Sequence, residues 1–103
     1  MPETFAVKVG EFEGPLPRLL ELVEKRRLPI SQVSLARVAD DFLQYVQALG
    51  QPPIPVLTEF LTIASTLMLI KSVSLLPSLT LTEGESAEIG DLERRLKLYQ
   101  TIR

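Results

Sequence analysis

The chain has 103 residues, a hydrophobic fraction of 46% and a net charge of −2, which suits one small globular domain. It contains no Cys and no His, which excludes disulfides, thiolate chemistry, soft-metal sites and most general-base catalysis. The slightly acidic balance argues against a general nucleic-acid binder, which normally carries a basic face.

The N-terminal residues 4–9 alternate between apolar and other side chains, with Phe5, Val7 and Val9 on one side. This pattern predicts one short extended segment, and no second strand pattern follows it. The start of the chain lacks a basic stretch followed by an apolar one, so no secretory signal is predicted and a cytoplasmic protein is expected.

The first predicted helix covers residues 15–27. It follows Gly14, which permits a sharp turn, and its apolar side chains recur at helical spacing. Cations at 25–27 suit the carboxyl end of a helix dipole, and Pro29 ends the helix. We interpret these cations as capping and solvation in preference to a DNA contact.

The second predicted helix covers residues 35–49, with Ser34 as its N-cap and Gly50 as its stop signal. Two parallel apolar seams run along it, which is typical of helices in bundles. The proline-rich connector that follows, residues 51–55, is predicted to be non-helical.

The third predicted helix, residues 57–76, carries most of the large apolar side chains. Its apolar arc is wider than one buried face needs, so the helix is either central in a bundle or shared with a partner. Polar and charged side chains interrupt the run, which favours a soluble helix over a membrane span. We assign four of its residues mainly to the core: Phe60, Ile63, Leu67 and Ile70.

Lys71 sits inside this apolar arc. Its stem could lie on apolar surface while its ammonium reaches water, or its charge could be reserved for a partner's carboxylate. Beyond Pro77, residues 78–90 read as a polar, acidic linker, and a last helix is predicted at 91–103. Because the linker offers few anchors, this helix should be the most weakly tethered, and the chain is expected to continue beyond it.

These elements predict an all-α fold: a small bundle of about four helices with a short extended N-terminal segment. The sequence shows no phosphate-binding glycine pattern, no activated nucleophile, and no metal or cofactor site. We therefore expect no enzyme, no small-molecule substrate and no membrane insertion. Surplus apolar helix surface points to a protein-binding module.

Several stretches resemble the family of bacterial segregation and condensation protein A, the kleisin subunits of prokaryotic SMC condensin. They cover nearly the whole chain in order and are FEGPL at 12–16, DFL at 41–43, EFL at 59–61, IKS at 70–72, LLP at 75–77 and RRL at 94–96. Departures from the family pattern are Pro17, Pro29 and the connector at 52–53.

The resemblance implies an N-terminal helical domain over residues 1–77 that binds the neck coiled coil of one SMC head. The region after it would bind a dimer of ScpB, and a C-terminal domain would bind the other head. Such a protein would bridge SMC heads in chromosome condensation and segregation, would be cytoplasmic and nucleoid-associated, and would meet DNA only indirectly through the complex.

Within that expectation we assign six residues to the SMC neck: Val38, Phe42, Leu61, Met68, Leu69 and Ser72. The alternatives are a stand-alone helical adaptor or homodimerisation module without an SMC partner, and a DNA-binding domain. The last would need a shared basic face formed by Lys25, Arg26, Arg27, Arg37 and Arg94.

Overall fold

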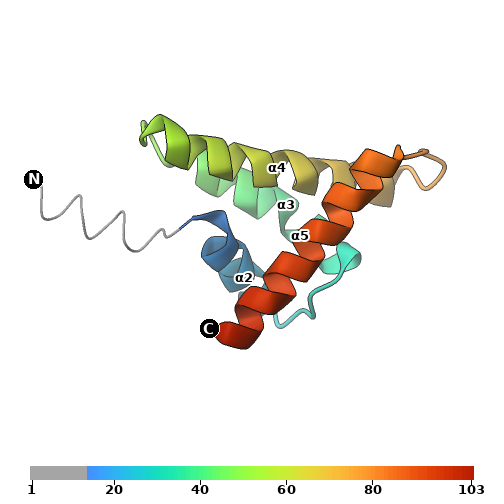
Figure 1. Ribbon diagram of the computed structural model, residues 1–103, viewed down its shortest axis with the longest axis horizontal. Helices are drawn as coiled ribbons and strands as arrows, with labels where there is room; N and C mark the ends of the chain where they lie inside the picture. Colours follow the sequence, from blue (N-terminus) through green and yellow to red (C-terminus); the bar gives the residue numbers. More distant parts are fainter. Residues whose placement is uncertain (1–13) are drawn as a thin grey trace, which may run out of the picture.

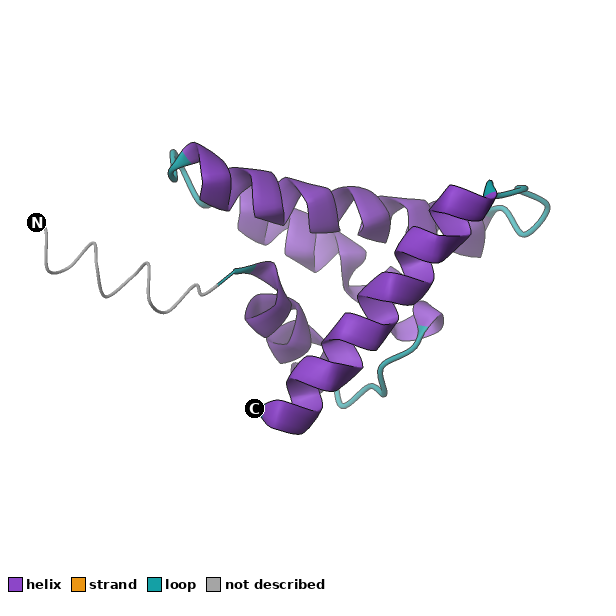
Figure 2. Ribbon diagram, in the orientation of Figure 1, coloured by secondary structure: helices purple, strands orange, loops and turns teal. Residues whose placement is uncertain are grey.

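The computed structural model describes residues 14–103, and the segment predicted at 4–9 lies outside them. Every regular element in the described part is an α-helix (Figure 2). They are α2 (Pro15–Lys25), α3 (Gln32–Gln47), α4 (Ile54–Leu75) and α5 (Glu83–Ile102). The predicted all-α class and helix number are therefore confirmed.

The longest helix, α4, is the centre of the packing. Helix α3 lies along it, and α5 runs from the carboxyl end of α4 across to α2 (Figure 1). Phe60 on α4 stacks on Phe42 of α3, with ring centroids 6.0 Å apart. The four residues predicted for the α4 core have at most 5% of their surface exposed, which confirms that part of the assignment: Phe60, Ile63, Leu67 and Ile70.

Three helices begin earlier than the sequence patterns predict, and α3 and α4 are the first two of them. The N-cap of α3 is Ser31, whose hydroxyl accepts a hydrogen bond from the backbone N–H of Ser34; Ser34 is therefore inside the helix. Helix α4 begins at Ile54 and includes Pro55 in its first turn. A proline is tolerated there because the N–H it lacks would have no intrahelical acceptor, so the prediction of a non-helical 51–55 is wrong for its last two residues.

Helix α5 begins at Glu83, which corrects the predicted linker at 78–90. A capping box starts the helix: the Thr82 hydroxyl accepts from the Glu85 N–H at 3.0 Å, and the Glu85 carboxylate accepts from the Thr82 N–H at 2.9 Å. This reciprocal pair satisfies two backbone donors that the helix leaves free. The acidic residues that were predicted to form a linker instead form the first turns of the helix, where carboxylates interact favourably with the helix dipole.

Helix α5 packs on α2 and α4 of its own chain. It buries Ile89, Leu92 and Leu96 against them. At its far end Arg103 donates two hydrogen bonds to the Glu24 carboxylate, at 2.6 and 2.9 Å, and Gln100 donates a third. The prediction that this helix is weakly attached is thus opposed by its buried apolar side chains and by the hydrogen bonds to Glu24, which we call the clasp.

Helix α2 ends in a Schellman motif that carries an unusual residue. The N–H of Leu28 donates to the carbonyl of Val23, and the N–H of Arg27 donates to the carbonyl of Glu24. The motif needs a left-handed residue, usually glycine, and Arg27 occupies that position with φ 58°. The helix therefore ends two residues before its predicted end at 27.

Candidate partner-binding surface

Helix α4 exposes an apolar stripe on the side away from the core. Leu61 and Met68 are 46% and 36% exposed, and Ile54 and Leu75 at the two ends are about 70% exposed, at 73% and 68%. These four residues, which we call the α4 stripe, lie seven positions apart. All four keep at least 36% of their surface accessible to solvent.

Spacing by seven defines the kind of partner that the α4 stripe fits. Side chains seven positions apart stay nearly in line along one face of a helix, as does one of the two apolar positions in each heptad of a left-handed coiled coil. A second helix can then pack along α4 at about 20° to its axis. The stripe spans the whole of α4, so the contact can continue for about 30 Å.

The structure separates the six residues predicted for the partner surface. Leu61 and Met68 belong to the α4 stripe, whereas Leu69 and Ser72 are half-buried beside it. Val38 and Phe42 are fully buried between α3 and α4. A partner cannot reach those two side chains, which corrects their assignment: they belong to the core because their seam of α3 faces Phe60.

The ends of the α4 stripe were missed by the sequence assignment. The sequence patterns predict Ile54 to lie in the proline-rich connector, and they do not assign Leu75, near the end of the third predicted helix, to the partner surface. The signal that could have found both is the repeat of large apolar residues every seven positions from 54 to 75. It was hidden because Pro55 suggested that no helix could include Ile54.

By length and composition alone, α4 would also be long and apolar enough to cross a membrane. The core helix of a globular domain meets the same criterion. Here the residues at 60, 63, 67 and 70 belong to the core that α4 forms with the three other described helices.

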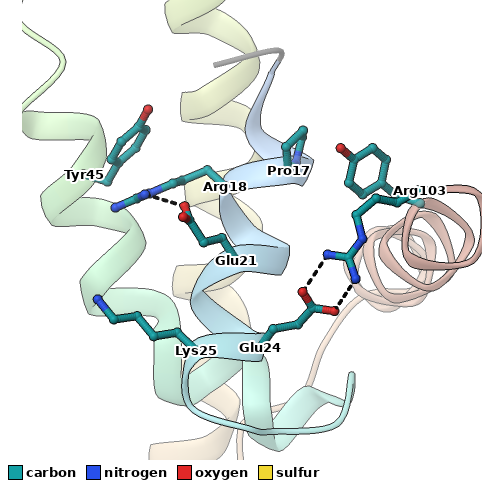
Figure 3. Close-up of a pocket in the computed structure, with 8 residues that line it drawn as sticks. Pro17, Arg18, Glu21, Glu24, Lys25, Tyr45 and Arg103 are labelled. Carbon is teal, nitrogen blue, oxygen red and sulfur yellow. Dashed lines mark hydrogen bonds and ion pairs between the residues drawn. The ribbon is translucent and has the colours of Figure 1, made fainter. Parts of the chain in front are cut away.

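A hollow lined by α2, α3 and α5 measures about 860 Å³. Figure 3 shows that its charged groups are mostly paired: Arg18 with Glu21, and Arg103 with Glu24. Hydrogen bonds from Arg103 and Gln100 hold the pKa of Glu24 below its usual value. Among the described residues, 14–103, no three acidic side chains gather into a group that could hold a metal ion.

The fold and the α4 stripe thus define a small all-α domain with an apolar face that its own helices leave uncovered. Comparison with known families assigns the domain. The model of the family "Segregation and condensation protein ScpA" matches residues 22–102, most of the chain. The chain belongs to this family, which confirms the resemblance seen in its sequence.

Individual relatives agree with the family match. Segregation and condensation protein A of Streptococcus uberis is 39% identical over 100 residues, which cover 94% of this chain and 42% of the relative. The protein of the same name from Halothermothrix orenii is 33% identical over 99 residues, covering 96% and 41%. That of Streptococcus mitis is 41% identical over 91 residues, covering 88% and 35%.

The chain spans about two fifths of the length of the first two relatives. The family match therefore applies to this helical region. It does not assign the activity of a full-length relative to this chain. No solved structure matches the chain.

Proposed function

We propose that this chain is the N-terminal helical domain of a kleisin and that the α4 stripe binds the neck coiled coil of an SMC protein. The role is non-enzymatic: the domain would attach one SMC head to the rest of the kleisin, in chromosome condensation and segregation. The observation that carries the proposal is the heptad-spaced stripe of exposed apolar side chains on the core helix. Membership of the family supports the identity of the partner.

The energetics favour a helical partner. Leu61 and Met68 lie near the middle of α4, where a docked helix would cover them most completely. Full burial of such a side chain is worth about 1.5–3 kcal/mol. Leu69 and Ser72, half-buried beside the stripe, would line its edge.

The remaining expectations from the family stand as parts of the same proposal. The region after this domain binds a ScpB dimer, and a C-terminal region binds the second SMC head. The protein acts in the cytoplasm at the nucleoid. We place the end of the helical domain after α5, beyond the predicted boundary at 77, because α5 packs on α2 and α4.

The test is a double substitution in the α4 stripe. Leu61→Glu with Met68→Glu places two charges where the proposed partner must bury apolar surface. We expect the helical circular dichroism to be retained and the affinity for an SMC head–neck fragment, measured by calorimetry, to fall at least 100-fold. If the folded double variant binds the SMC fragment with native affinity, the α4 stripe is not part of the interface.

A matched control is available on α5. Leu98 and Ile102 are also exposed apolar residues one helical turn apart, at 59% and 72% exposure. Leu98→Glu with Ile102→Glu introduces the same charge at equal or greater exposure but outside the α4 stripe. This control should bind the SMC fragment like the unchanged chain.

The alternative occupant of the α4 stripe is a second copy of this chain, because an exposed apolar stripe can also pair with its own copy. Light scattering of the chain alone separates the two cases. A monomer that forms a complex with the SMC fragment supports the proposal. A stable dimer that the same Leu61→Glu, Met68→Glu variant dissociates, with no binding to the SMC fragment, would favour the homodimer.

A further inference from the structure

Four exposed cations lie at the carboxyl end of α2, in the turn after it and in the second turn of α3: Lys25, Arg26, Arg27 and Arg37, which we call the basic corner. Arg26 joins the two helices, since it donates to the carbonyl of Arg37 at 3.4 Å and to the carboxylate of Asp41 at 2.6 Å. The corner is therefore a product of the fold, formed by residues 25–27 and a residue ten positions further on.

Three members of the basic corner have no carboxylate partner among residues 14–103: Lys25, Arg27 and Arg37. This sets them apart from the cations of α5, since Arg94 and Arg95 pair with Asp91 and Lys97 pairs with Glu93. Figure 3 shows the same contrast around the hollow, where Lys25 extends without an ion pair while Arg18 and Arg103 are each joined to a glutamate.

The backbone at Arg27 supplies an independent observation. Its left-handed conformation is disfavoured for a residue with a side chain and is normally assigned to glycine at this position of the motif. Residues held in such conformations often serve function at a cost in stability. Arg27 is itself exposed in this turn.

We infer that the basic corner contacts the phosphate backbone of DNA directly, which replaces the interpretation of the cations at 25–27 as capping and solvation alone. Its cations are exposed and distributed over the end of α2, the turn after it and α3, which suits a polyanion that meets several of them at once better than a small anion needing an enclosed pocket. The choice of DNA as that polyanion rests on the proposed chromosomal function. The contact would be independent of base sequence and would add to the indirect association expected through the SMC complex.

The first test uses the chain alone and a fluorescein-labelled duplex of about 30 base pairs, followed by anisotropy across a salt series. Weak binding that decreases steeply with salt is expected. Lys25→Gln, Arg27→Gln and Arg37→Gln together should weaken binding at least tenfold at low salt. The logarithmic salt slope should fall by roughly one for each cation removed.

The matched control removes three paired cations from α5: Arg94→Gln, Arg95→Gln and Lys97→Gln. It changes the net charge by the same amount. If the basic corner is the site, this control keeps most of the affinity and of the salt slope. An equal loss in both triple variants would overturn the proposal, because general charge would then explain the binding.

Arg27→Gly separates function from folding. Glycine relieves the left-handed backbone, so the Tm should rise by several degrees, while DNA affinity and the salt slope should fall. A destabilised variant could not give this combination. Three outcomes would each overturn the proposal. The first is that Arg27→Gly has the higher Tm but unchanged DNA affinity, and the second is that the unsubstituted chain does not bind DNA at low salt. The third is that the unsubstituted chain binds labelled polyglutamate instead of DNA. None of these measurements involves the SMC fragment, so their failure leaves the proposed function untouched.

Discussion

Lys71 of α4 donates to both carboxylate oxygens of Asp40 on α3, each at 2.7 Å. The cation inside the apolar arc thus has a partner within its own chain. A carboxylate from another protein is therefore not needed to pair with it. The Lys71 side chain is 30% exposed, and its ammonium reaches an aspartate on α3 that is 63% exposed.

The pair should contribute little to stability because both groups keep contact with water. Exposed ion pairs are worth about 0–1 kcal/mol. We expect Lys71→Met and Asp40→Asn each to change the free energy of unfolding in urea by less than about 1 kcal/mol. The coupling in the double-mutant cycle should be similarly small and should vanish in about 1 M salt. A coupling above about 2 kcal/mol would show that the pair is effectively buried.

Leu67 lies at the centre of the core and is fully buried. Leu67→Ala should lower the free energy of unfolding by about 2–5 kcal/mol, and Leu67→Glu should leave the chain without helical circular dichroism. Leu61→Ala provides the comparison on the same helix, since its side chain is 46% exposed, and should cost less than about 1 kcal/mol. Equal losses at the two positions would contradict the division of α4 into core and exposed stripe.

The capping box makes the start of α5 testable. Thr82→Ala removes the oxygen that accepts from the Glu85 N–H and should cost about 0.5–2 kcal/mol. Thr80→Ala, in the connection before the helix, should be nearly neutral. Hydrogen exchange should show protected amides from 89 to 96 and fast exchange at 78–81. Fast exchange through the whole of 78–103 would support the weak tether predicted from the sequence.

The clasp between α2 and α5 predicts a pH dependence. Arg103 and Gln100 lower the pKa of Glu24 in the folded chain, so the ionised carboxylate stabilises the fold above the unfolded pKa. This stabilisation is lost as the pH falls through the lowered, folded pKa. Glu24→Gln should therefore lower the Tm at about pH 7, and the difference from the unchanged chain should shrink below about pH 4. A difference that persists at low pH would exclude the ionised clasp as its cause.

The α4 core was predictable from the sequence because the spacing of Phe60, Ile63 and Leu67 places them on one face whatever the partner. The seams of α3 were not separable in the same way. Val38 and Phe42 repeat with the same rhythm as Ala39 and Val46, and tertiary packing buries all four. Periodicity marks a face as apolar, but it does not say whether that face meets the core or another molecule.

Helix ends depend on local sequence patterns, whereas pairs of residues far apart in the sequence depend on how the helices pack. The Thr82 and Glu85 capping box was visible as a local pattern, but the acidic composition around it favoured a linker. The Lys71 and Asp40 pair joins residues 31 positions apart, so it depends on the register between α3 and α4. The basic corner likewise needs the turn that brings Arg37 beside Arg26.

The most direct test of the proposed interface uses the absence of cysteine from this chain. Single variants Met68→Cys in the α4 stripe and Leu98→Cys on α5 are exposed to an alkylating reagent, with and without the SMC head–neck fragment, and modification is followed by mass. The proposal predicts that the fragment slows alkylation at position 68 at least tenfold and leaves position 98 unchanged. A complex that forms while position 68 reacts at its free rate would contradict it.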